Sequence, residues 1–160
     1  MIGKDMKTTD LMFGDYLHFV QEDDNDELGL KRGEKYVATV TAINEHYIEA
    51  LVSFRRKDTG YIFTKYVTGI MGVNFQPIPI TEDFLENNGW HKLDWKDVNY
   101  HPGVSTQYKH DWFTDTLRIS YNDLMHHYCT LDDEISHLKY VNELQHVFHL
   151  INTDFDFSVK

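Results

Sequence analysis

Pro77 and Pro79 lie two positions apart and divide the sequence into halves with different residue patterns. Neither proline has a backbone N–H to donate to a β-sheet, and each pushes the residue before it toward an extended conformation. The segment therefore predicts a stiff connector over residues 77–81. It would join a first domain at 1–76 to a second domain at 82–160.

The first half has a residue pattern typical of short strands separated by turns. Residues 36–43 are rich in β-branched side chains, and apolar residues fall on alternate positions from 48 to 54, which is the period of a half-buried strand. Residues 55–60 then read as a hairpin loop and 61–67 as the returning strand. Turns this frequent predict a small SH3-like barrel or a bent sheet.

The second half begins with helix signals. Thr81 is a good N-cap residue, and Gly89 is a natural residue for the position just after a helix, so a short helix is expected at about 82–88. Further along, Ser136 can cap a longer helix from about 137 to 151, in which the apolar residues gather on one face. Alternating apolar residues at 155–159 suggest a terminal edge strand.

Between these two helices the residue pattern is again typical of strands. The predicted strands are broken by turn residues and form an antiparallel meander, over residues 90–95, 106–113, 117–121 and 125–131. The fold class expected for the whole chain is therefore α+β and β-rich. A small barrel or bent sheet is followed by a unit made of a helix, a meander and a second helix.

Three stretches carry a resemblance to a known group of proteins. They are the Pro-Ile-Pro-Ile-Thr connector at 77–81, the Asn-Gly-Trp helix end at 88–90 and the Tyr-Val-Asn-Glu-Leu-Gln-His sequence at 140–146. Together they resemble small uncharacterised proteins of Bacteroides-type gut bacteria and their phages or prophages, in which the connector reads Pro-Ile-Pro-Leu-Thr and the late helix Tyr-Val-His-Glu-Leu-Gln. The resemblance covers roughly residues 75–150. It implies a fold and a mobile-element context, and no activity.

Charge and cysteine content restrict the possible functions. The chain has 15 basic and 26 acidic side chains and a formal net charge of −11, which repels phosphate backbones and disfavours general binding of nucleic acid. The single cysteine, Cys129, excludes an intramolecular disulfide and a cysteine-based structural zinc site. The first residues have no apolar core of signal-peptide length, and no apolar run approaches the ~20 residues that span a bilayer, so neither a signal peptide nor a membrane segment is expected. A cytoplasmic protein without a membrane segment or a cofactor is expected.

The late helix comes within one residue of a zinc-protease motif. In the pattern His-Glu-x-x-His, two histidines one turn apart hold zinc and the glutamate activates water, but Asn142 stands where the first histidine belongs. His146 and His149, at i, i+3 spacing, remain weak candidates for a shared metal. The alternative is that Asn142, His146 and His149 form the wet polar face of an amphipathic helix, with Glu143 as a solvated carboxylate.

Arg55, Arg56 and Lys57, with Tyr61 and Phe63, form a cluster of basic and aromatic residues on the predicted hairpin. Small β-barrels bind single-stranded nucleic acid by stacking bases on aromatic side chains in a positive groove, so the 55–66 hairpin is a weak candidate for such a site. The alternative interpretation is a hairpin that its charged turn keeps soluble.

Residues 22–27 put five carboxylates in six positions. A calcium loop of the EF-hand type needs a glycine at its sixth position and a glutamate at its twelfth, and neither possible register satisfies both. This stretch is therefore predicted to be a solvated loop, and one that could meet a basic partner.

No motif in the chain defines a reaction. The sequence lacks a P-loop, a dinucleotide-binding glycine motif and a nucleophile elbow. The function we expect is that of a non-enzymatic protein-interaction or accessory module of a phage or other mobile element. Two alternatives stay open: a metal-dependent hydrolase that uses the histidines, and a weak binder of single-stranded nucleic acid.

Overall fold

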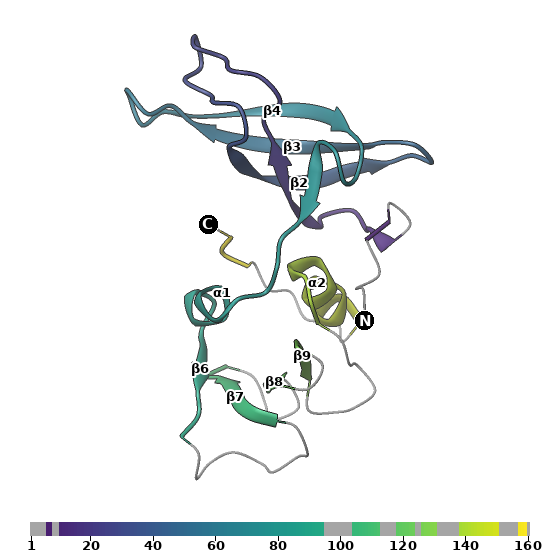
Figure 1. Cartoon of the computed structure of the whole chain (residues 1–160), viewed down its shortest axis with the longest axis vertical. Coiled ribbons are helices and arrows are strands. Elements are labelled where there is room, and N and C mark those ends of the chain that lie inside the picture. The colour runs from purple at the N-terminus through teal and green to yellow at the C-terminus, as the bar shows by residue number, and fades with distance from the viewer. Residues whose placement is uncertain are drawn as a thin grey trace. The chain divides into compact units, whose positions relative to one another are not determined.

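The computed structural model describes residues 6–7, 10–94, 104–112, 118–123, 126–130, 138–150 and 157–159. Within these residues the fold is α+β and strand-rich, with two antiparallel sheets and two helices (Figure 1), so the predicted class is confirmed. The chain forms two compact units, of which the first ends at Ile78 and the second covers Pro79–Val159. None of the described helices is long and apolar enough to cross a membrane.

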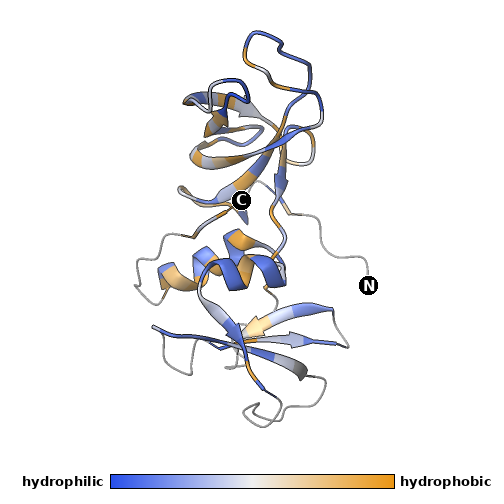
Figure 2. Cartoon of the chain, turned by 90° about the vertical axis from the view of Figure 1, so that its left-hand side faces the viewer, coloured by the Kyte–Doolittle hydropathy of each residue, from blue (hydrophilic) through white to orange (hydrophobic). Residues whose placement is uncertain are grey.

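Five strands form the sheet of the first unit in the order β4-β3-β2-β1-β5. They are β1 (Tyr16–Val20), β2 (Lys35–Ile43), β3 (Ile48–Arg55), β4 (Ile62–Gly69) and β5 (Phe75–Pro77), and every pairing is antiparallel. More buried and less buried residues alternate along β3, as the sequence predicted for 48–54, and Figure 2 shows polar and apolar residues interspersed in the strands of this unit. No pairing joins the two edge strands in the described part of the chain. Of the two alternatives, the bent sheet is therefore confirmed and the closed barrel is not formed.

A row of aromatic side chains crosses the inner face of this sheet. The strand registers place one aromatic residue of each strand in the row: Phe63, Phe54, Tyr36, Phe19 and Phe75. The ring centroids of Phe19 and Phe54 are 6.5 Å apart although β2 lies between their strands. Strands two apart in a flat sheet are separated by roughly 10 Å. The contact therefore indicates that the sheet curls over its inner face.

The proline-rich segment is held by neighbours at both of its ends. Pro77 ends β5, an edge strand, which is where a residue without an N–H is tolerated in a sheet. Pro79 forms an isolated bridge with Tyr140, and the N–H of Ile80 donates to the carbonyl of Lys139 at 3.0 Å.

The first helix, α1 (Glu82–Asn87), confirms the helix predicted at about 82–88. The Thr81 hydroxyl accepts a hydrogen bond from the N–H of Phe84 at 3.1 Å, as an N-cap does. After the helix, Gly89 takes a φ of +91°, a conformation that glycine adopts without strain.

The second sheet is the predicted meander, with the order β6-β7-β8-β9. Its strands are β6 (Trp90–Lys92), β7 (Val104–His110), β8 (Ile119–Asn122) and β9 (His127–Thr130). The strand predicted to reach residue 95 ends at Lys92. Of the terminal strand predicted at 155–159, only 157–159 lie within the described residues, and they form no strand.

The second helix, α2 (Val141–Leu150), begins later than the predicted residue 137. The N-cap proposed for it, Ser136, lies outside the described residues. Lys139 and Tyr140 precede the helix, and both donate their N–H groups to Oε2 of Glu143, at 2.6 and 3.1 Å. This is half of a capping box, because the third helical residue reaches back to the chain before the helix. Glu143 is half-buried, so its carboxylate caps the helix while part of it stays in contact with solvent.

The core of the second unit is a closed aromatic cluster. Trp90 is fully buried, and its ring centroid lies 6.1 Å from that of Phe148 on α2 and 6.3 Å from that of Phe157. Phe84 of α1 stacks on Phe157 at 5.8 Å. Both helices, β6 and the end of the described chain therefore meet around one indole ring.

Candidate functional site

A groove of about 410 Å³ opens on the first unit between β4 and the loop that joins β1 to β2. Its apolar part is lined by Phe19, Phe54, Leu28, Leu30 and Val67. Polar residues share the lining, among them Glu22, Asp23, Lys65 and Asn74. A concave surface on which apolar side chains meet several polar groups is a candidate binding site.

The wall formed by β4 is an open strand edge. The hairpin N–H of Arg56 donates to the carbonyl of Tyr61 at 2.9 Å, which makes these two residues a hydrogen-bonded pair. Hydrogen-bonded and non-bonded pairs alternate in an antiparallel ladder, so the next residues with outward-facing backbone groups are 62, 64, 66 and 68. Thr64, Tyr66 and Thr68 are exposed and turn their N–H and C=O groups away from β3. Among the described residues no strand pairs with this edge.

The groove is closed at the Gly69 end of β4 by a contact that requires glycine. The side chain of Asn74 lies so close to Gly69 that a Cβ added there would meet the Asn74 Cβ at 2.5 Å. The Asn74 amide oxygen accepts from the N–H of Ile70 at 3.0 Å, and its amide nitrogen donates to Glu22 at 2.6 Å. Asn74 thus ties the end of β4 to the loop on the opposite side of the groove.

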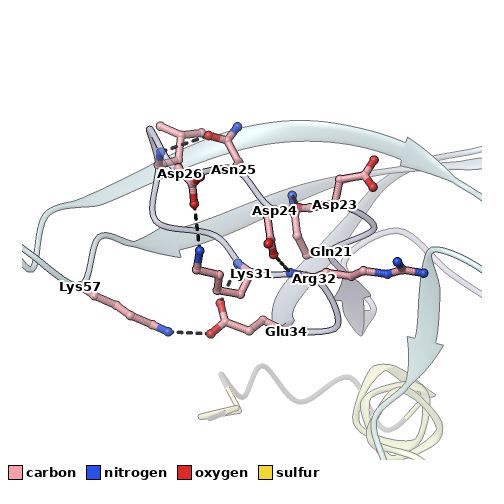
Figure 3. A network of polar contacts seen from close by, with 10 residues as sticks. Gln21, Asp23, Asp24, Asn25, Asp26, Lys31, Arg32, Glu34 and Lys57 are labelled. Atoms are coloured by element: carbon pink, nitrogen blue, oxygen red, sulfur yellow. Dashed lines mark hydrogen bonds and ion pairs between the residues drawn. The ribbon is translucent and has the colours of Figure 1, made fainter.

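The acidic loop is held in shape by its own side chains (Figure 3). The Asp24 carboxylate accepts the backbone N–H of Arg32 at 2.8 Å, and Asp26 pairs with Lys31 at 2.8 Å. The hydrogen bond from Lys31 also lowers the pKa of Asp26. Asn25 accepts from the N–H of Leu28 at 3.1 Å. The predicted loop is therefore exposed to solvent, but these hydrogen bonds hold it in one shape. The groove wall that it forms is preorganised.

A second link ties this loop to the β3–β4 hairpin. Lys57 donates to Glu34 at 2.6 Å, and the Tyr36 hydroxyl donates to the same carboxylate at 2.5 Å. The Lys57 hydrogen bond, followed by that of Tyr36, lowers the pKa of Glu34 to about 2. Burial raises the pKa of Tyr36, and its bond to Glu34 adds to the effect. The carboxylate is thus charged at every pH at which proteins are usually studied.

Two of the three basic side chains of the predicted cluster are in ion pairs. Lys57 is in the ion pair with Glu34, and Arg56 makes a two-point contact with Asp58 at 3.0 and 3.1 Å. Phe63 stacks on Phe54 at 5.2 Å, so this ring belongs to the aromatic row rather than to a free stacking surface. Arg55 and Tyr61 are exposed. The structure therefore brings the predicted residues together as a charge-paired hairpin and not as a positive groove.

The predicted metal candidates on α2 differ in their surroundings. His146 is half-buried and His149 is exposed, whereas Asn142 is only 1% exposed. The prediction that all three form one wet face is therefore wrong for Asn142. In the part of the chain that the structure describes, no group of three His, Cys, Asp or Glu residues is arranged to hold a metal ion.

A second cavity, of about 380 Å³, lies beside the helix α1 terminus in the second unit. His110 lies in its wall and is 3% exposed. Its Nδ1 accepts the N–H of Trp112 at 3.1 Å, so Nε2 carries the proton and donates to the carbonyl of Asn88 at 2.8 Å. Burial lowers the pKa of His110. The Nε2 bond thus joins β7 to the end of α1, and the Nδ1 bond holds the chain just after β7.

Comparison of the chain with protein-family models, curated proteins and solved structures found no match.

Most of the groove is not evident from the sequence. The sequence predicts the acidic loop and the 55–66 hairpin, but no local pattern connects them with Phe19, Leu28 or Asn74. One usable signal was present: the predicted strand 61–67 puts Lys65 between Phe63 and Val67 on the core-facing side. A charged residue on the inward face is one way in which natural edge strands avoid pairing. That pattern predicts an edge at β4, though not a groove beside it.

Proposed function

We propose that this protein is a protein-interaction module that binds an extended segment of a partner along β4. The observation that carries the proposal is the open edge of β4 beside a groove lined by both apolar and polar side chains. A partner segment that adds to a sheet edge gains backbone hydrogen bonds, and pockets for its alternate side chains give selectivity.

The geometry provides both contributions within one short region. Thr64, Tyr66 and Thr68 offer backbone donors and acceptors at the edge, and strand addition satisfies them without any rearrangement of β3. Next to them, the half-buried Phe19, Leu28 and Val67 give the groove an apolar patch on which a side chain of the added strand can lie. Because the loop wall is already fixed by its hydrogen bonds, little ordering is needed on binding.

The two alternative functions have weaker support. The basic side chains needed for nucleic acid are mostly in ion pairs, and a metal-dependent hydrolase has no ligand cluster among the described residues. The cytoplasmic location and the mobile-element context remain predictions from the sequence and form part of the proposal.

The proposal is tested by removing one edge N–H without touching the groove. Thr64 lies on β4, its N–H faces the open edge, and its side chain does not line the groove. Peptides of nine random residues are selected for binding to the full chain by display, and the best are titrated onto wild type and onto Thr64→Pro. We expect Thr64→Pro to bind about tenfold more weakly, since proline removes a hydrogen bond and obstructs its neighbours.

Thr64→Val is the matched control, because it keeps the N–H and the β-branched shape, and it should bind like wild type. Amide hydrogen exchange gives a second readout, since a bound strand protects the N–H groups of residues 64, 66 and 68. Selected peptides that bind Thr64→Pro as tightly as wild type, with no protection at these amides, would contradict the proposal.

A further inference from the structure

We infer that the segment bound along β4 carries an apolar residue and, two positions away from it in the direction of Gly69, a lysine or arginine that is held by Glu22 and Asp23. This inference rests on the proposed function and specifies the partner's chemistry. Two carboxylates at the groove rim supply the charge complementarity, and the closed end of the groove determines where the basic residue must lie.

The two rim carboxylates have capacity left for a ligand. One oxygen of Glu22 accepts from Asn74 at 2.6 Å, and within the described residues the other oxygen accepts nothing. The Asp23 carboxylate, which Figure 3 shows turned away from the network of the loop, makes no hydrogen bond or ion pair in the same part of the chain. Both side chains are exposed at the rim. A guanidinium or ammonium group can thus approach both without displacing a protein partner.

Asn74 fixes the position of this negative charge along the strand. Because its side chain contacts both Gly69 and Glu22, Glu22 lies at the Gly69 end of β4. Val67 precedes Gly69 by two residues and packs against the core on the groove side of the strand. Alternate residues of a strand share a face and are roughly 6.6 Å apart. An added strand with an apolar residue opposite Val67 therefore places its next groove-facing residue near Glu22.

At the other end of the groove, Lys65 disfavours a basic residue of the partner. It lies on the same face as Val67, two residues earlier, and is exposed in the groove wall. A basic residue of the partner opposite Lys65 would be repelled, because like charges directly across a strand pair are destabilising. The groove is thus positive at Lys65, apolar at Val67 and negative at Glu22. This order selects one placement of a basic residue rather than a generally cationic peptide.

The test uses the peptides selected on the full chain. We expect an excess of lysine and arginine two positions from an apolar residue, and its loss when selection is repeated on Glu22→Gln/Asp23→Asn. One selected arginine peptide is then compared with the same peptide carrying citrulline, which keeps the shape and removes the charge. The arginine peptide should bind wild type about fivefold more tightly, and the double variant should bind the two peptides equally.

Glu27→Gln is the matched control, since Glu27 belongs to the same acidic loop, is exposed and does not line the groove. It should change the arginine preference by less than about twofold. An equal affinity of wild type for the arginine and citrulline peptides, with the Thr64→Pro effect intact, would overturn this inference and leave the proposed function standing. If the selected peptides ignore Thr64→Pro, or if the chain instead pairs with a second copy of itself along β4, both proposals fail.

Discussion

The two units use aromatic side chains in opposite ways. In the first unit the aromatic rings form a row across one face of a curled sheet, and the row borders an accessible groove that Phe19 and Phe54 line. In the second unit Trp90 is fully buried against Phe148 of α2 and Phe157, and Phe157 in turn stacks on Phe84 of α1. Aromatic content alone therefore does not indicate a binding surface. A row that ends at an open strand edge leaves apolar surface available, and a closed cluster does not.

The units also differ in charge. The first has nine basic and twelve acidic side chains up to Ile78, whereas the stretch Pro79–Val159 has five basic and fourteen acidic ones. Most of the net negative charge therefore belongs to the second unit. In the first unit, Asp26 and Glu34 are paired with lysines. The negative charge at the groove rim therefore comes from Glu22 and Asp23, which are not in such pairs among the described residues. Local pairing, rather than the total charge, decides which acidic residues are available to a partner.

The largest expected effect tests the closed cluster. Trp90→Ala should lower the free energy of unfolding by about 3 to 5 kcal/mol, since it removes a fully buried indole and leaves a cavity. Phe63→Ala should cost less, because Phe63 is only partly buried at the edge of its sheet. Urea unfolding followed by circular dichroism measures both changes. Equal losses would mean that the row of the first unit is packed as tightly as the cluster of the second.

A smaller effect is expected at the closed end of the groove. Gly69→Ala places a Cβ 2.5 Å from the Asn74 Cβ, so the turn must shift. We expect a loss of about 1 to 3 kcal/mol of stability, together with weaker peptide binding, because Glu22 loses its support. Gly60→Ala is the control: it has a φ of +70° with open space around it, and should cost about 1 kcal/mol without affecting binding. Unchanged binding by Gly69→Ala would show that Asn74 does not organise the groove.

The smallest expected effect is a pH dependence of the stability of the second unit. The pKa of His110 is lowered, chiefly because burial penalises its charged form. Its contribution to stability is therefore present above the unfolded value of about 6.5 and is lost as the pH falls below it. Unfolding by urea at about pH 7.5 and about pH 5.8 should show this loss, and His110→Gln should reduce it, since glutamine keeps a donor for the Asn88 carbonyl. A pH dependence unchanged in His110→Gln would assign the effect to another histidine.

Local signals predicted much of the fold. Thr81 and Gly89 placed α1 because capping depends on neighbouring residues, and the alternation at 48–54 placed β3 for the same reason. The start of α2 was predicted four residues early, because the chain before it pairs with β9 and Pro79, which are distant in the sequence. Helix capping by Ser136 was plausible locally, and the observed start follows from pairings that periodicity does not reveal.

By itself the sequence determined the α+β class, the short helix after the proline segment and the acidic loop, since each follows from neighbouring residues. Only the tertiary structure decided that β4 is an open edge, that Asn74 closes the groove against Gly69 and that Lys57 is neutralised by Glu34. These features depend on contacts between residues far apart in the chain, 23 positions for Lys57 and Glu34 and 52 for Asn74 and Glu22. The groove exists only once the sheet has formed and curled.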